Sequence, residues 1–327
     1  MNRIIIKPSM ALDTICFLQQ RLLNKKEWMK ADQIKEIEYI NGLLPTGFDN
    51  EFLSMSSLCL IISSFYDDDL EALTLDDFIR DFQSPKDISR IVKGRIKNEF
   101  TASYLFPMLD WLNQGYANVY VDKLKTLKNI GFETIYNERI LPLVQREGTR
   151  LKKEIEGTNP EELFRNISIF KNAPIVDHAD IYVSFFSYPT AFKLYNGSFL
   201  TCFTNGSVDY YPLIAHELMH GFASDEAIRL YKEHVESDER LRECHRALIE
   251  YQREGDEEEF VIAAECYLCY LSGYYPIDKL RSTVKGYYGG YCPTAVAIFE
   301  QLIKEHAIPA DYNGWLIQNF FGKQPHG

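Results

Sequence analysis

The sequence predicts an α+β fold that is predominantly helical, and three observations lead to this prediction. Apolar residues recur every three or four positions through most of residues 1–156, which is the pattern of amphipathic helices. A stretch rich in β-branched and aromatic residues between 180 and 204 predicts a small antiparallel sheet. Further helical segments follow it up to residue 306. The chain has 327 residues, of which 46% are hydrophobic, and this suffices for one or two domains with a sizeable core.

The first part of the chain, residues 1–157, is expected to be a helical N-terminal region. Gly157-Thr158-Asn159-Pro160 interrupts the charged segment Arg146–Glu156, because Gly and Pro end helices. We therefore predict a domain boundary at residue 157 and assign 158–327 to a second domain. Within the first region, the spacing of apolar residues predicts helices in 11–24, 31–43, 51–66, 86–113 and 115–130.

The predicted sheet opens the second domain. Asp180–Ser187 consists largely of β-branched and aromatic residues, and Pro189 ends this strand. Two further short strands, 191–195 and 198–204, flank Asn196-Gly197. Asn-Gly supplies the left-handed backbone that a tight hairpin turn requires. An antiparallel hairpin is therefore expected shortly before the next helix.

That helix contains His216-Glu217-Leu218-Met219-His220, which has the pattern H-E-x-x-H. Residues four apart on a helix lie on one face, with Cβ atoms about 5–6 Å apart. Two imidazoles at that spacing can bind one metal ion, and the Glu between them can take a proton from a water that the metal activates. We therefore predict a zinc site with His216 and His220 as ligands and Glu217 as the general base.

The surroundings of the motif favour a buried helix. Leu213, Ile214, Ala215 and Phe222 place apolar groups around it at helical spacing, and unpaired polar groups in such a helix cost several kcal/mol. A metal would satisfy both imidazoles and the carboxylate. Asp209 is the predicted N-cap and Pro212 fits the first turn. Two core histidines bonded to the backbone are the alternative interpretation.

A catalytic zinc ion needs a third protein ligand and an open position for water. The helices predicted after the motif are 225–255, which is polar, 256–272, which is apolar, and 293–306. Glu265 lies in the apolar helix, where a lone charge is costly unless it is paired or bound to a metal. We therefore predict Glu265 as the third ligand. Glu258 and Glu259 stay open as alternatives, although the helix dipole also accounts for acidic residues at that helix start.

These residues resemble a known group of enzymes. An H-E-x-x-H helix after a strand and a hairpin, with a glutamate on a later helix, is similar to the gluzincin group of zinc metallopeptidases. Ala264-Glu265-Cys266-Tyr267 resembles the glutamate-bearing helix of that group. The resemblance covers roughly 180–300. It implies a zincin-like catalytic domain, a Zn²⁺ cofactor and hydrolysis of a peptide or protein substrate.

A glycine- and tyrosine-rich segment adds a second resemblance. Gly286-Tyr287-Tyr288-Gly289-Gly290-Tyr291 is similar to the Gly/Tyr segment of thimet-type oligopeptidases, whose tyrosines stabilise an oxyanion. This implies that Tyr287 or Tyr291 donates a hydrogen bond to the developing charge. The segment departs from that pattern at Cys292, where a further Tyr is expected. A glycine-rich turn before a helix is the alternative interpretation.

Composition narrows the classes of function. A net charge of −12 disfavours nucleic-acid binding. The longest apolar run, Leu58–Ile62, is too short to cross a bilayer, and the N-terminus lacks the features of a signal peptide. Seven cysteines without framework spacing favour a reducing, cytoplasmic location. The sequence gives no indication of oligomeric state. A catalytically inactive zincin-fold binding or regulatory protein is the alternative function.

Overall fold

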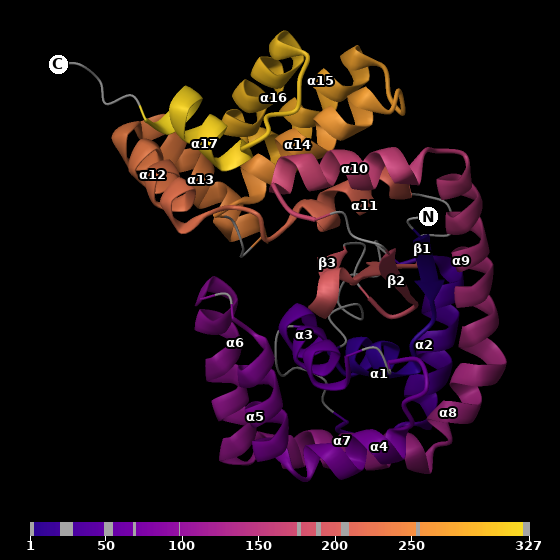
Figure 1. Cartoon of the computed structure of the whole chain (residues 1–327). Helices are drawn as coiled ribbons and strands as arrows, with labels where there is room; N and C mark the ends of the chain where they lie inside the picture. Colours follow the sequence, from indigo (N-terminus) through magenta and orange to yellow (C-terminus); the bar gives the residue numbers. More distant parts are fainter. Residues whose placement is uncertain are drawn as a thin grey trace. The chain divides into compact units, whose positions relative to one another are not determined.

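The computed structural model describes residues 3–19, 29–48, 55–67, 70–97, 99–174, 178–187, 191–203, 209–252 and 256–322. The described chain is mostly helical and contains a small four-stranded sheet, which confirms the predicted α+β class (Figure 1). The chain divides into two compact units. The sheet unit comprises Ile4–Lys152 and Ala179–Val208, and the motif unit comprises Met1–Arg3, Lys153–His178 and Asp209–Gly327. Compactness does not test independent folding, so the predicted domain boundary at residue 157 stays a prediction.

The sheet unit combines four strands with nine helices and two π-helical turns in its described part. The strands are β1 (Arg3–Lys7), β2 (His178–Ser184), β3 (Phe192–Lys193) and β4 (Phe199–Cys202). The helices are α1 (Met10–Gln19), α2 (Ala31–Leu43), α3 (Met55–Tyr66), α4 (Leu75–Phe82), α5 (Pro85–Arg95), α6 (Glu99–Trp111), α7 (Ala117–Asn129), α8 (Phe132–Ile135) and α9 (Leu141–Glu156), whose last four residues belong to the motif unit. The π-helical turns are Leu112–Tyr116 and Tyr136–Ile140.

The sheet is mixed, so the prediction of a purely antiparallel sheet was wrong. The predicted hairpin is present: β3 pairs antiparallel with β4, and a 3₁₀ turn at Tyr195–Gly197 joins them, with Gly197 at φ 76°. The strand order is β1-β2-β4-β3, and β2 runs parallel to β4. Turn residues specify only the pair of strands that they join. The pairing of β2 with β4, and the missed strand β1, depend on contacts distant in sequence.

Most predicted helices of the first region are present. The range 31–43 coincides with α2, and 115–130 contains α7. The range 86–113 is divided between α5 and α6, since α5 ends at Arg95 and Ile96 adopts an extended backbone. The predicted residues 20–24, 51–54, Pro189 and Thr204 lie outside the described residues.

The motif unit is helical. It contains α10 (Pro160–Lys171), α11 (Tyr210–Met219), α12 (Asp225–Ser237), α13 (Glu239–Gln252), α14 (Glu258–Leu271), α15 (Ile277–Gly286), α16 (Pro293–Glu305) and α17 (Tyr312–Leu316), with a 3₁₀ turn at Tyr287–Gly290 and a π-helical turn at Ile317–Phe321. The single polar helix predicted over 225–255 is two helices, α12 and α13. Asp238 separates them with an extended backbone (φ −128°, ψ 124°). Within that range, 253–255 lie outside the described residues.

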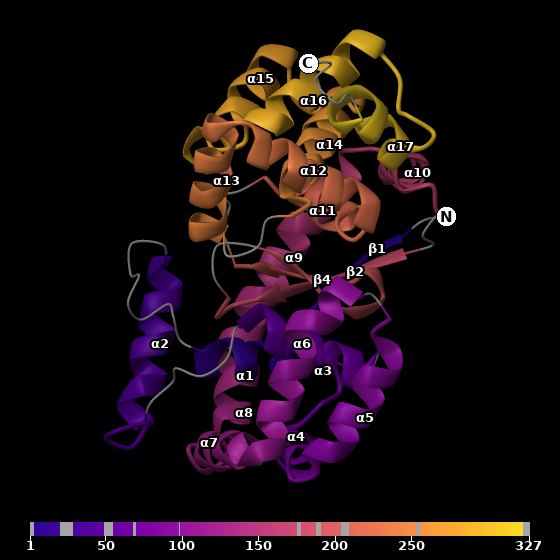
Figure 2. The same ribbon diagram turned by 90° about the vertical axis from the view of Figure 1, so that its left-hand side faces the viewer.

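Helix α14 is the centre of the motif unit. Every residue from Glu258 to Cys269 is buried, as expected of a helix that is apolar almost all round. It packs against α11 and α16, and Figure 2 shows these helices close together. Phe260 contacts the rings of Phe222 and Tyr231. These two contacts hold the first turn of α14 against α12 and against the segment that follows the H-E-x-x-H motif.

No helix within the described ranges is both long and apolar enough to cross a lipid bilayer.

One buried carboxylate ties the sheet unit together. Asp13 on α1 is fully buried, and its Oδ1 accepts hydrogen bonds from Ser184 Oγ (2.5 Å) and the backbone N–H of Phe186 (3.1 Å). Its Oδ2 accepts from the phenol of Tyr136 at 3.1 Å. Burial raises the pKa of Asp13 to about 6, although these hydrogen bonds lower it in part. The group therefore binds a proton more tightly in the folded chain than in the unfolded chain.

This shift predicts a pH dependence of stability. With an unfolded pKa of about 3.9, the stabilisation from protonated Asp13 is fully present below about pH 4 and is lost as the pH rises through about 6. The loss amounts to about 3 kcal/mol, since one pKa unit corresponds to about 1.4 kcal/mol. Urea unfolding between pH 4 and 7 should show a weaker pH dependence in Asp13→Asn. The exposed Asp122→Asn serves as control, and an unchanged slope in Asp13→Asn would contradict the assignment.

Candidate metal centre

The start of helix α11 is capped by a residue distant in sequence. Asp209 occupies the predicted N-cap position, but its side chain makes no capping hydrogen bond and accepts instead from the phenol of Tyr275. Glu154 Oε1 accepts from the backbone N–H groups of Tyr210 (2.5 Å) and Tyr211 (3.2 Å). A carboxylate at a helix N-terminus also interacts favourably with the helix dipole. Glu154 therefore does what the sequence predicted for Asp209.

The end of α11 falls inside the motif. The helix ends at Met219, and His220 leaves it with an extended ψ of 149°. Gly221 follows with φ 78°, a left-handed conformation that favours glycine. Lys171 Nζ donates to the carbonyl oxygens of Leu218 (3.0 Å) and His220 (2.8 Å), and so satisfies acceptors that the helix leaves open. His220 is thus held by its backbone contacts and not by a helical turn of its own.

The two imidazoles of the motif and one carboxylate converge. Nε2 of His216 lies 3.2 Å from Nε2 of His220. Glu258 Oε1 is 3.3 Å from Nε2 of His216, and Glu258 Oε2 is 3.7 Å from Nε2 of His220. Within the part of the chain that the structure describes, these are the three potential metal ligands whose donor atoms all lie within 4.8 Å of one another.

The other ring nitrogen of each histidine also contacts a carboxylate. Nδ1 of His216 lies 3.1 Å from Glu265 Oε2, and Nδ1 of His220 lies 3.1 Å from Glu257 Oε1. Glu257 itself accepts hydrogen bonds from two backbone N–H groups of the turn that follows the motif, those of Gly221 (2.6 Å) and Ala223 (3.2 Å). A carboxylate on Nδ1 fixes the ring orientation and leaves Nε2 available as a ligand.

The charges in this cluster compensate one another. Burial lowers the pKa of His216, but Glu258 and Glu265 outweigh it and raise that pKa well above its usual value. The pKa of His220 is raised in the same way, because Glu257 and Glu258 outweigh its burial. Burial raises the pKa of Glu258, but the two imidazoles and Tyr288 lower it to about 2. Glu258 is therefore ionised and faces the Nε2 atoms.

Three consecutive glutamates at the start of α14 have three separate sets of partners. Successive residues on a helix point about 100° apart. Glu257 contacts His220 and the turn after the motif, whereas Glu258 contacts both imidazoles. Glu259 accepts from the phenol of Tyr231 (2.7 Å) and from the backbone N–H of Ala295 (2.9 Å) at the start of α16. Only Glu258 of the three is placed to act as a metal ligand.

Two tyrosines of the Gly/Tyr segment complete the cluster. The phenol of Tyr287 donates to Glu265 Oε2 (2.6 Å), and that of Tyr288 donates to Glu258 Oε1 (2.8 Å). Burial and the adjacent carboxylates raise the pKa of both phenols, so both stay protonated donors. Tyr291 is 42% exposed. The predicted oxyanion role of Tyr287 or Tyr291 stays a prediction. In this structure the phenol of Tyr287 donates its hydrogen bond to Glu265.

The structure brings together most of the residues singled out from the sequence. Glu258, however, lies where the sequence analysis expected Glu265. His216 and His220 meet as predicted, and Glu217 is buried beside them on α11. Glu265 contacts Nδ1 of His216, which is the side of the ring away from His220 and Glu258. The geometry therefore favours Glu258, the alternative, over Glu265 as third ligand.

Two residues of the cluster had not been singled out from the sequence. Glu257 is the N-cap residue of α14, and the acidic run that contains it was the one available indication. Tyr288 lies within the Gly/Tyr segment, but the pattern did not distinguish its phenol from those of its neighbours.

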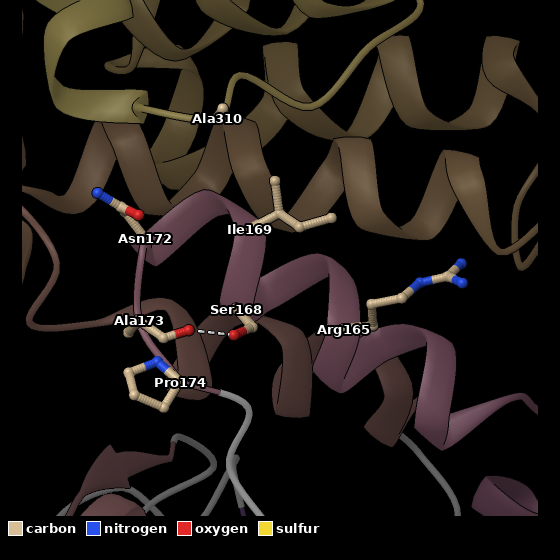
Figure 3. Close-up of a pocket in the computed structure, with 7 residues that line it drawn as sticks. All are labelled: Arg165, Ser168, Ile169, Asn172, Ala173, Pro174 and Ala310. Carbon is tan, nitrogen blue, oxygen red and sulfur yellow. Dashed lines mark hydrogen bonds between the residues drawn. The ribbon is translucent and has the colours of Figure 1, made fainter.

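A surface hollow of about 510 Å³ lies elsewhere in the motif unit, along α10. It is lined by Arg165, Ser168, Ile169, Asn172, Ala173, Pro174 and Ala310 (Figure 3). None of these residues belongs to the histidine–glutamate cluster. The histidine–glutamate cluster, and not this hollow, contains the potential metal ligands, so we consider the cluster the candidate functional site.

Comparison with known proteins gives no family: no protein-family model, curated protein or solved structure matches this chain.

The capping role of Glu154 predicts the effect of its removal. Glu154→Ala should lower the free energy of unfolding by about 1–2 kcal/mol, because the N-terminal N–H groups of α11 lose their acceptor. Chemical denaturation in the presence of a chelator measures this without a contribution from metal. Glu156→Ala, two positions away and exposed, is the matched control. Equal stability of the two variants would show that Glu154 does not cap the helix.

Proposed function

We propose that this protein is a zinc-dependent peptidase of the gluzincin type, in which His216, His220 and Glu258 hold the metal. The observation that carries the proposal is the convergence of both Nε2 atoms on one carboxylate, while a separate carboxylate contacts each Nδ1. Two imidazoles and one carboxylate, with an open fourth position, form a ligand set of catalytic zinc sites.

The separations between the donor atoms fit a zinc ion. Ligand atoms about 2.0–2.1 Å from a tetrahedral metal lie about 3.3–3.4 Å from one another. The separations here are 3.2 Å between the two Nε2 atoms, and 3.3 and 3.7 Å from these atoms to the Glu258 oxygens. The three side chains therefore need little rearrangement to bind a single ion. A zinc ion bound there would lower the pKa of a water molecule and polarise a carbonyl group.

The residues of the chain supply the remaining steps. Glu217 takes the proton of the attacking water and transfers it to the leaving amine, as a general base and then a general acid. Glu265 and Glu257 keep the imidazoles oriented through Nδ1. We propose a peptide or protein as substrate, since the group that the motif resembles cleaves peptide bonds. The seven cysteines are all free, which supports our proposal of a reducing, cytoplasmic location.

The ligand assignment predicts different losses of metal affinity. Wild-type protein should bind one zinc ion per chain. Glu258→Gln should lower the affinity by more than about 100-fold, because it replaces the charged ligand with a neutral amide. Glu265→Gln should lower it by about 10–100-fold, because Glu265 orients the ring of a ligand and does not itself bind the metal. Competition with a chromophoric chelator measures both. The exposed Glu236→Gln is the control. A larger loss of zinc affinity in Glu265→Gln than in Glu258→Gln would show that Glu265 is the third ligand, as the sequence predicted.

The general-base assignment predicts a separation of binding from activity. Glu217→Gln should keep the zinc stoichiometry of the wild type and lower kcat by at least about 10²–10⁴-fold on any peptide that the wild type cleaves. A peptide-library digest analysed by mass spectrometry identifies such a substrate. Full activity in Glu217→Gln would refute the mechanism. A wild type that binds zinc and cleaves no peptide would instead support the inactive binding protein.

A further inference from the structure

The hydrogen bond between Tyr288 and Glu258 involves a single carboxylate oxygen. The phenol donates to Oε1 at 2.8 Å. Oε1 also lies 3.3 Å from Nε2 of His216, whereas the other oxygen, Oε2, lies 3.7 Å from Nε2 of His220. The phenol therefore occupies one side of the carboxylate that the proposed function makes a metal ligand, and distinguishes its two oxygens from each other.

The backbone of Tyr288 is strained to make this contact. Tyr288 has φ 46° and ψ 44°, a left-handed conformation that is disfavoured for residues with a Cβ atom. The next two residues, Gly289 and Gly290, also have positive φ, of 72° and 89°. A turn alone would be formed more readily by glycine at all three positions. A tyrosine at the first position places a phenol on Glu258, which a glycine cannot do.

The neighbouring tyrosine provides an internal comparison. Tyr287 belongs to the same 3₁₀ turn, and its phenol contacts Glu265 instead. Glu265 faces Nδ1 of His216 and is not among the three converging donors. The turn thus supplies one phenol to the ligand carboxylate and one phenol to a carboxylate that only orients a ligand.

We propose that Tyr288 is a positioning residue that makes Glu258 bind zinc through one oxygen. Because the phenol binds one oxygen and not the other, it disfavours binding of both oxygens to the metal, and a coordination position stays open for water and substrate. This inference rests on the proposed function, because it assigns a role toward the same metal.

The test compares Tyr288→Phe, Tyr287→Phe and the exposed control Tyr116→Phe with the wild type. Zinc affinity is measured by chelator competition, and the geometry of the site by the visible absorption of bound Co²⁺, whose bands weaken when the coordination number rises above four. Tyr288→Phe should lower zinc affinity by about 10–100-fold. It should also weaken the Co²⁺ bands, because Glu258 is then free to bind through both oxygens.

The controls separate positioning from general destabilisation. Tyr287→Phe should leave the Co²⁺ spectrum unchanged, since its phenol does not contact a ligand, and Tyr116→Phe should change neither quantity. If Tyr288→Phe is less stable, its Co²⁺ spectrum still decides, because only folded protein forms the site. Wild-type affinity and spectrum in Tyr288→Phe would overturn the inference and leave the proposed function standing. A wild type that binds neither metal would overturn both.

Discussion

The close contact of two imidazoles with three carboxylates, of which His216, Glu258 and Glu265 are buried, is the constraint on which the motif unit depends. Any one of these groups alone in the interior would be costly, and their mutual contacts make the cluster tolerable. The helices around the cluster also stabilise it. Helix α14 is covered on all sides, which keeps water from weakening these contacts, and Lys171 and Glu154 satisfy the two ends of α11. The other helices of the motif unit pack around this histidine–glutamate cluster.

The parts of the centre that follow from local periodicity are predictable from the sequence. The spacing of His216 and His220 predicted that their imidazoles would meet, and the apolar helix around Glu265 predicted that this carboxylate would need a buried partner. Both expectations agree with the structure. The hairpin at Asn196-Gly197 and the overall α+β class were equally accessible, because turn chemistry and hydrophobic spacing act over a few residues.

The remainder depends on geometry that no local pattern contains. Burial showed that Glu265 needs a partner but could not show which ring nitrogen it would face. The role of Tyr288 depends on a left-handed backbone, and such a conformation is not expected of a tyrosine. The cap from Glu154 and the parallel pairing of β2 with β4 join segments that are far apart in the chain. In each case the tertiary structure determines which of several chemically suitable side chains makes the contact.

The acidic run before Phe260 shows what fixes the register of helix α14. Asp256, Glu257, Glu258 and Glu259 are consecutive, and the last three occupy three different directions around the start of α14. Deletion of one residue after Glu259 would rotate the run by about 100°. Glu257 would then take the place of Glu258, and Asp256 that of Glu257. A carboxylate would still face the two histidines, but Glu259 would take the buried place of Phe260, so the apolar residues of α14 and not the glutamates fix the register of the helix.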